Sequence, residues 1–149
     1  MPSHDRALPP QYPLGEFARR FPDEEACLRW LWRTTLSPDG RHAHCEGCGT
    51  TRLFRRYSTA QRRRSWTCTA CGRHVQPTAG PIFAGSATSL ELWFYATYLM
   101  VGTRGAISAR QLERELGVTY KTAWRMRRKI AAALAAPEER ARAGLLASA

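Results

Sequence analysis

The sequence predicts a small α+β protein, in which an N-terminal helix and a short β-rich segment precede an all-helical region. Three observations lead to this prediction. Four cysteines form two Cys-x-x-Cys-Gly pentapeptides in the middle third of the 149-residue chain. Short strand-like runs lie between and after these pentapeptides, and apolar helical patterns follow residue 88. Each part is too small to bury a large core, so we expect two compact units.

The two pentapeptides occupy residues 45–49 and 68–72, and nineteen residues separate Cys48 from Cys68. A Cys-x-x-Cys turn offers two thiolates to one ion, so two such turns complete the tetrahedral shell of a structural zinc site. The glycine after each second cysteine suits a tight turn with positive φ. We therefore expect one structural Zn²⁺, held by Cys45, Cys48, Cys68 and Cys71.

Two disulfides, or four unconnected buried thiols, are the alternatives to a metal site. Residues 1–15 are polar and proline-rich, with no apolar segment typical of a signal peptide. The expected compartment is a reducing cytoplasm, where thiols stay free to bind metal. Cys27 lies outside the pattern in an apolar helical run, and we interpret it as a small core residue.

The N-terminal half contains an arm, a helix and a zinc ribbon. Residues 1–20 carry four prolines and few large aliphatic side chains, which indicates a disordered arm. A helix over 21–36, capped near Asp23, is expected to pack on the ribbon. The ribbon itself covers 37–84 and is predicted to have three strands, at 51–57, 61–67 and 73–76.

The C-terminal half is predicted to be helical. Thr88 with Glu91, and Ser108 with Gln111, fit the spacing of capping boxes. The helix over 90–101 is apolar nearly all round, so its aromatic side chains are interpreted as buried core. Residues 88–135 as a whole are predicted to form a helix-turn-helix domain, and 136–149 an alanine-rich tail.

The second helix of this domain has two distinct sides. Ala123, Met126 and Ile130 fall on one apolar stripe that continues to Leu134 after the turn at Gly117 and Val118. The opposite side is basic and aromatic, which suits a helix in the major groove of DNA. A plain helical hairpin with a solvated basic face is the alternative. The expected DNA contacts are Thr119, Tyr120, Lys121, Trp124, Arg125 and Arg128.

Charge points to the same kind of partner. The chain carries a formal net charge of +11, and no acidic residue occurs between Glu46 and Glu91. Such a one-sign field indicates binding to a polyanion, here double-stranded DNA. No apolar stretch is long enough to span a membrane, so a membrane partner is not expected. Three consecutive arginines are candidate phosphate contacts, although they also suit a solvated strand edge: Arg62, Arg63 and Arg64.

Several segments together resemble the N-terminal part of a bacterial insertion-sequence transposase. They are the two cysteine turns, Trp93, and the strings FPDEEA (21–26), TAGPIF (78–83), ISARQL (107–112) and GVTYKTAWRM (117–126). The resemblance covers about residues 20–130. It implies a zinc ribbon and a helix-turn-helix that bind the inverted repeats at the element's ends. Pro81 replaces the hydroxyl residue expected from the family pattern.

In that family a ribonuclease-H-like catalytic domain of the DDE type follows, and its acidic residues hold divalent metal. We do not expect such a domain within these 149 residues, because after Glu115 the only acidic residues are Glu138 and Glu139. We therefore expect no catalytic residues and no enzyme activity from this chain alone. Its expected partners are DNA and a catalytic domain or full-length transposase, in the bacterial cytoplasm at the nucleoid.

A stand-alone zinc-ribbon and helix-turn-helix regulator is the main alternative function. A module that binds RNA or the transcription machinery is a third interpretation. It is less favoured, because the deep, narrow groove of A-form RNA does not admit a helix.

Overall fold

The structure is a computed structural model that describes residues 14–57, 65–78, 88–138 and 140–141. The chain divides into two compact units. The sheet unit comprises residues 25–85, and the helical unit comprises residues 1–24 together with 86–149. Five helices and a curled four-stranded antiparallel sheet make up the described part, so the protein is a small α+β protein.

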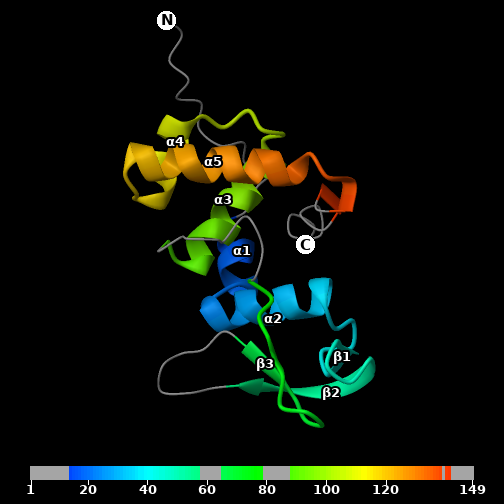
Figure 1. The fold of residues 1–149 in the computed structure, drawn as a ribbon. Coiled ribbons are helices and arrows are strands. Elements are labelled where there is room, and N and C mark those ends of the chain that lie inside the picture. The colour runs from blue at the N-terminus through cyan, green and yellow to red at the C-terminus, as the bar shows by residue number, and fades with distance from the viewer. Residues whose placement is uncertain (1–13, 58–64, 79–87, 139, 142–149) are drawn as a thin grey trace, which may run out of the picture. The chain divides into compact units, whose positions relative to one another are not determined.

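The sheet is built from β1 (His42–Cys45), β2 (Thr50–Tyr57), β3 (Ser65–Cys68) and β4 (His74–Val75) in sequential order. Figure 1 labels the first three of these strands. The prediction of three strands was wrong by one, because β1 was missed. Its sequence, HAHC, contains no β-branched residue and only alternates exposed with buried positions. Pairing with β2, from His42 opposite Leu53 to Cys45 opposite Thr50, makes it a strand.

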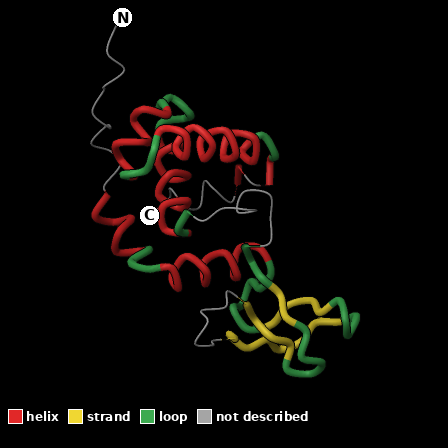
Figure 2. The backbone as a smooth tube through the Cα atoms, turned by 60° about the vertical axis from the view of Figure 1, so that its left-hand side comes forward, coloured by secondary structure: helices red, strands yellow, loops and turns green. Residues whose placement is uncertain are grey.

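Helix α2 (Glu24–Thr35) lies along one face of this sheet (Figure 2). Trp32 stacks on Trp66 of β3, with ring centroids 4.8 Å apart and an interplanar angle of 8°. Phe54 of β2 approaches the same indole at 5.6 Å. All three rings are buried, and an aromatic pair adds about 0.5–1.5 kcal/mol beyond the burial of its area. Cys27 is fully buried in α2, as expected of a core residue.

The chain leaves α2 through a turn closed by a hydrogen bond from the Gly40 amide to the Ser37 carbonyl. The Asp39 carboxylate accepts hydrogen bonds from the amides of His42 and Arg41 and contacts the His42 ring. These hydrogen bonds hold the pKa of Asp39 well below its usual range, and those from the two backbone amides have the largest effect. Trp32 donates its indole N–H to the Gly40 carbonyl, which ties the turn to the aromatic core.

The helical unit consists of α1 (Leu14–Arg20), α3 (Leu90–Gly102), α4 (Ala109–Leu116) and α5 (Tyr120–Leu134). Helix α3 is its core, and most of its apolar side chains are buried, as predicted. Residues 14–20 form a helix where the sequence analysis expects a disordered arm. The physical reason is Phe17, whose ring lies 4.9 Å from Tyr98 and 5.2 Å from Phe21.

One of the two predicted capping boxes is present in the helical unit. The Ser108 side chain and Gln111 form a complete capping box at α4. Thr119 caps α5, and its hydroxyl accepts from the Thr122 amide. At α3 the cap is Ser89, which accepts from the Leu92 amide, so the predicted box starting at Thr88 was wrong by one residue.

A sharp turn at Gly117 connects α4 to α5. Its φ of +66° is left-handed, and its amide donates to the Glu113 carbonyl at 3.0 Å. Across this turn Leu112 and Leu116 of α4 are buried, as are the α5 residues Ala123, Met126 and Ile130. Among the described residues, no helix has the length and apolar character needed to cross a membrane.

We expect Gly117→Ala to lower the free energy of unfolding by about 1–2 kcal/mol, the cost of placing a Cβ in the left-handed region. A Cβ at this position would meet no atom within 4 Å, so no steric clash adds to the backbone strain. Urea denaturation followed by circular dichroism measures it. Gly117→Asn is the control and should cost less, because asparagine tolerates this conformation. Equal stability of the alanine variant and the unsubstituted chain would contradict the left-handed turn.

Candidate metal centre and nucleic-acid interface

Four cysteine sulfurs converge at one end of the sheet. All four lie within 4.8 Å of one another. Cys45 ends β1 and Cys68 ends β3, while the turns after these strands supply Cys48 and Cys71. Sulfur–sulfur distances across the two turns are 3.5 Å for Cys45 to Cys71 and 3.9 Å for Cys48 to Cys68. The four residues that the sequence analysis assigned to one site are therefore neighbours in space.

The two turns have the same internal geometry. Gly49 and Gly72 adopt φ values of +70° and +80°, as expected from the pentapeptides. The amide of each glycine donates to the carbonyl of the first cysteine of its turn, at 2.8 Å and 2.9 Å. A left-handed glycine lets the chain reverse at once and places both sulfurs of the turn on one side.

Amide groups of the second turn also reach the sulfurs. The N–H groups of Cys71 and Ala70 point at the Cys68 sulfur and lower the pKa of that thiol to about 6. The Arg73 amide lowers the pKa of Cys71, but the neighbouring thiols, Cys45 first among them, outweigh it and raise this pKa to about 11. The four thiols thus resist full ionisation, because their thiolates would repel one another at this spacing. A cation at their centre would offset that repulsion.

A cation of the protein itself stands at the edge of the cluster. The Arg52 side chain hydrogen-bonds the Cys48 sulfur, and this bond, with the charge of the thiolates, raises the pKa of Arg52. A four-thiolate site with one divalent ion carries two negative charges, which an adjacent guanidinium partly neutralises. Arg52 lies in the acid-free interval of the sequence, but the sequence analysis did not predict this specific contact.

The cluster fits a tetrahedral metal ion. Sulfurs about 2.3 Å from a central zinc are about 3.8 Å apart, close to the distances seen across the two turns. All five cysteines of the chain are free, which argues against the disulfide alternative. Cys45 and Cys68 are buried, Cys48 is half-buried and Cys71 is exposed. Four thiols at this spacing can bind a metal ion such as zinc.

The described residues contain no second group of three or more His, Cys, Asp or Glu side chains close enough to share a metal ion. His42 contacts Asp39, and His74 bonds the Thr67 hydroxyl at 2.8 Å. Both histidines thus bond to side chains outside the cysteine cluster.

The second candidate region is the outer face of α5. Lys121, Arg125 and Arg128 are exposed, as are Tyr120 and Trp124, whose exposed fractions are 43% and 48%. We name these five residues the basic–aromatic face. It lies opposite the buried stripe of α5, so the amphipathic pattern expected from the sequence is present.

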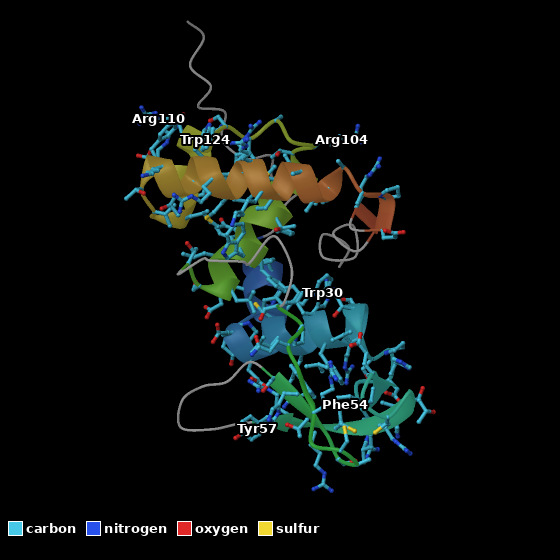
Figure 3. The ribbon with its side chains drawn as sticks, in the orientation of Figure 1. Trp30, Phe54, Tyr57, Arg104, Arg110 and Trp124 are labelled. Carbon is cyan, nitrogen blue, oxygen red and sulfur yellow. The ribbon has the colours of Figure 1, made fainter. Side chains whose placement is uncertain are left out.

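Cations and rings alternate on this face and its border. Arg128 lies over the Trp124 ring at 5.4 Å. Arg110 of α4 lies over the Tyr120 ring at 4.4 Å, and Figure 3 labels Arg110 and Trp124. Arg110 was not among the expected DNA contacts. Thr119 was, but its hydroxyl is engaged in capping α5. Arg62, Arg63 and Arg64 lie outside the described residues.

Another arginine of α5, Arg127, points inward. Its Nε donates to the Ile107 carbonyl at 2.8 Å, and its Nη2 donates to the Gly105 carbonyl at 3.2 Å. It thus joins α5 to the connection between α3 and α4. The sequence analysis did not single out Arg127. The sequence offered one indication of its inward position: Arg127 directly follows Met126, which belongs to the buried stripe.

Comparison with known proteins gives one informative similarity. The chain is 33% identical over 119 residues to an uncharacterized protein in the transposable element ISH50 of Halobacterium salinarum. The alignment covers 80% of this chain but 36% of that protein, so the chain spans about a third of its relative's length. No family model matches the chain, and no solved structure matches it. The chain is thus related to a protein of a transposable element.

Replacing one ligand should remove the metal and unfold the sheet unit. We expect Cys68→Ser to lose a stoichiometric zinc ion, measured by elemental analysis, and to lose the β signal in circular dichroism. Cys27→Ala, which changes a buried cysteine away from the cluster, is the control and should keep the metal. Retention of one zinc ion and an unchanged thermal transition by Cys68→Ser would contradict the four-cysteine site.

Arg127→Gln should lower the free energy of unfolding by about 1–3 kcal/mol, because the backbone carbonyls of Gly105 and Ile107 lose their charged hydrogen-bond donor. Arg125→Gln removes the same charge from the exposed side of the same helix and should change stability little. Chemical denaturation of both variants makes the comparison. Equal destabilisation by the two substitutions would show that Arg127 has no special anchoring role.

Proposed function

We propose that this chain is the DNA-binding portion of an insertion-sequence transposase, and that it binds duplex DNA at the ends of the element. The basic–aromatic face of α5 is the observation that carries the proposal. The similarity to a protein of a transposable element supplies the biological setting.

In this proposal helices α4 and α5 act as a helix-turn-helix. Gly117 makes the turn short, and the buried leucines of α4 face the buried stripe of α5, so the second helix is rigidly supported. Its exposed side then offers two kinds of group. Lysine and arginine can pair with phosphates or with guanine edges, and aromatic rings can contact thymine methyl groups. In this proposal Arg125 reads a base edge, and Lys121 and Arg128 contact phosphates.

Arg110 extends this interface onto α4. Held over Tyr120 at 4.4 Å and 3.5 Å from Glu113, its guanidinium stays at the border of the face. In a helix-turn-helix the first helix crosses the DNA backbone, so a phosphate contact suits this position.

The cysteine cluster has a structural role in the proposal. One Zn²⁺ held by Cys45, Cys48, Cys68 and Cys71 fixes the two turns of the sheet unit, and a complete shell of four thiolates leaves no position for a substrate. Arg62, Arg63 and Arg64 are proposed to add phosphate contacts from the sheet unit, which would account for the acid-free interval of the sequence.

We assign binding to this chain, and strand cleavage and joining to a catalytic domain that works with it. The three-carboxylate chemistry of such a domain needs acidic residues brought together around divalent ions. The acidic residues of this chain are few and scattered in the sequence. The greater length of the relative supports the idea of a further domain, and it favours this proposal over a stand-alone regulator.

The test is selection of duplexes from a random-sequence pool by the zinc-loaded chain, followed by affinity measurements on a selected duplex and its scrambled version. Arg125→Ala should reduce the preference for the selected duplex about tenfold, the effect of losing one base contact. Arg63→Ala should weaken both duplexes equally and lower the slope of log affinity against log salt by about one.

Two results would count against this division of roles. One is a pool that shows no enrichment with the unsubstituted chain. The other is an Arg125→Ala variant that loses equal affinity for the selected and scrambled duplexes.

A further inference from the structure

The two faces of the sheet are used very differently. The inner face packs against α2 through Phe54 and Trp66, which are 4% and 3% exposed. Arg56 of β2 also belongs to this face. It lies 4.9 Å from the Trp66 ring and pairs with Glu25 of α2 at 3.0 Å.

Side chains alternate along a strand, so the residues between these belong to the outer face. Strand register places Arg55 of β2, Thr67 of β3 and His74 of β4 in one row across the sheet. Tyr57 stands two residues after Arg55, and its ring lies 4.8 Å from the His74 ring. Figure 3 labels Phe54 and Tyr57, which represent the inner and outer faces of β2.

Around Arg55, Thr67 and His74 this outer face carries hydrogen-bond donors. Strands β1 to β4 contain no acidic residue. In the described part of the sheet unit each acidic side chain already has a cationic or imidazole partner: Glu25 with Arg29 and Arg56, Asp39 with His42 at the β1 side of the outer face, and Glu46 with Arg73. Arg55 is exposed and has no ion-pair partner among the described residues. His44 of β1 is exposed on the same face.

We propose that the outer face of the sheet, centred on Arg55, Tyr57, Thr67 and His74, binds single-stranded DNA. The exposed Arg55 guanidinium, in one row with the Thr67 hydroxyl and the His74 imidazole, suits phosphate oxygens. The adjacent Tyr57 and His74 rings offer a surface on which an unpaired base stacks, as aromatic residues on open sheets do in other single-strand binders.

A single strand fits this face better than a duplex does. A duplex hides the flat faces of its bases, and a four-stranded sheet is too wide to enter a groove that admits a helix or a two-stranded ribbon. The assignment to DNA rests on the proposed function, because α5 would hold the duplex from which an unpaired strand emerges. The site itself uses different residues in a different unit of the chain.

The experiment measures fluorescence anisotropy of a labelled oligo-dT of about 15 nucleotides with the full zinc-loaded chain. Arg55→Ala and Tyr57→Ala should each weaken binding about tenfold. Tyr57→Phe keeps the ring and should bind as the unsubstituted chain does. Arg41→Ala is the control and should have no effect. Arg41 is exposed just before β1, where its carbonyl accepts a hydrogen bond from the amide of Phe54, and it is not part of the row formed by Arg55, Thr67 and His74.

Bound zinc is measured in every variant, so that loss of binding is separated from loss of folding. Equal weakening by Arg41→Ala and Arg55→Ala would overturn the proposal, because it would show a diffuse charge effect. So would equal weakening by Tyr57→Phe and Tyr57→Ala, or tighter binding of oligo-U than of oligo-dT.

The two DNA proposals fail separately. Arg125→Ala should weaken duplex binding and leave oligo-dT binding unchanged. If Arg125→Ala abolishes oligo-dT binding, the single strand binds at α5 and the sheet proposal is wrong. If Arg125→Ala has no effect on duplex binding, the proposed role of α5 is wrong. The proposal for the sheet is then still tested by comparing the oligo-dT affinities of Arg55→Ala and Arg41→Ala.

Discussion

The sheet unit depends on bringing four sulfurs within 4.8 Å of one another. Four ionised thiols at this distance repel strongly, and four protonated thiols hold one another only weakly, so the arrangement is stable when a cation occupies its centre. The two turns are the ends of two hairpins, β1 with β2 and β3 with β4. Joining them fixes the curl of a sheet whose strands are otherwise short.

The aromatic core of the sheet unit lies beside this cluster and cannot replace it. Trp32, Phe54 and Trp66 bury one face of the sheet, but a core of three rings and a single helix is small for independent folding. Phe54 is directly opposite Cys68 in the strand register, so the ring packing and the sulfur positions constrain each other. A metal ion held by the four cysteines would therefore support the same few residues as the aromatic stack, from the opposite direction.

Sequence patterns predicted best the features that depend on neighbours along the chain. The cysteine turns, the Ser108 capping box and the buried stripe of α5 are all local or periodic, and the structure contains them. Strand β1 was missed because its pairing with β2, and not its composition, makes it a strand. Helix α1 was missed because Phe17 finds its partners, Tyr95 and Tyr98, more than seventy residues away.

The roles of individual arginines show the same limit. Spacing separates the two sides of α5, but it does not show that Arg127 reaches the carbonyls of Gly105 and Ile107 in another segment. Nor does it distinguish Arg52 at the Cys48 sulfur, Arg56 in an ion pair with Glu25, and Arg55 exposed on the outer sheet face. These three arginines lie within five positions of one strand, and only the register and the packed helix assign their surroundings.

The inward position of Arg127 has a consequence for how the sequence of α5 can diverge during evolution. Its bonds and the buried stripe secure α5 from one side, while Lys121, Arg125 and Arg128 are exposed on the other. The exposed residues can be exchanged without disturbing the support beneath them. A lineage of related chains can therefore diversify the surface of α5 while retaining one scaffold.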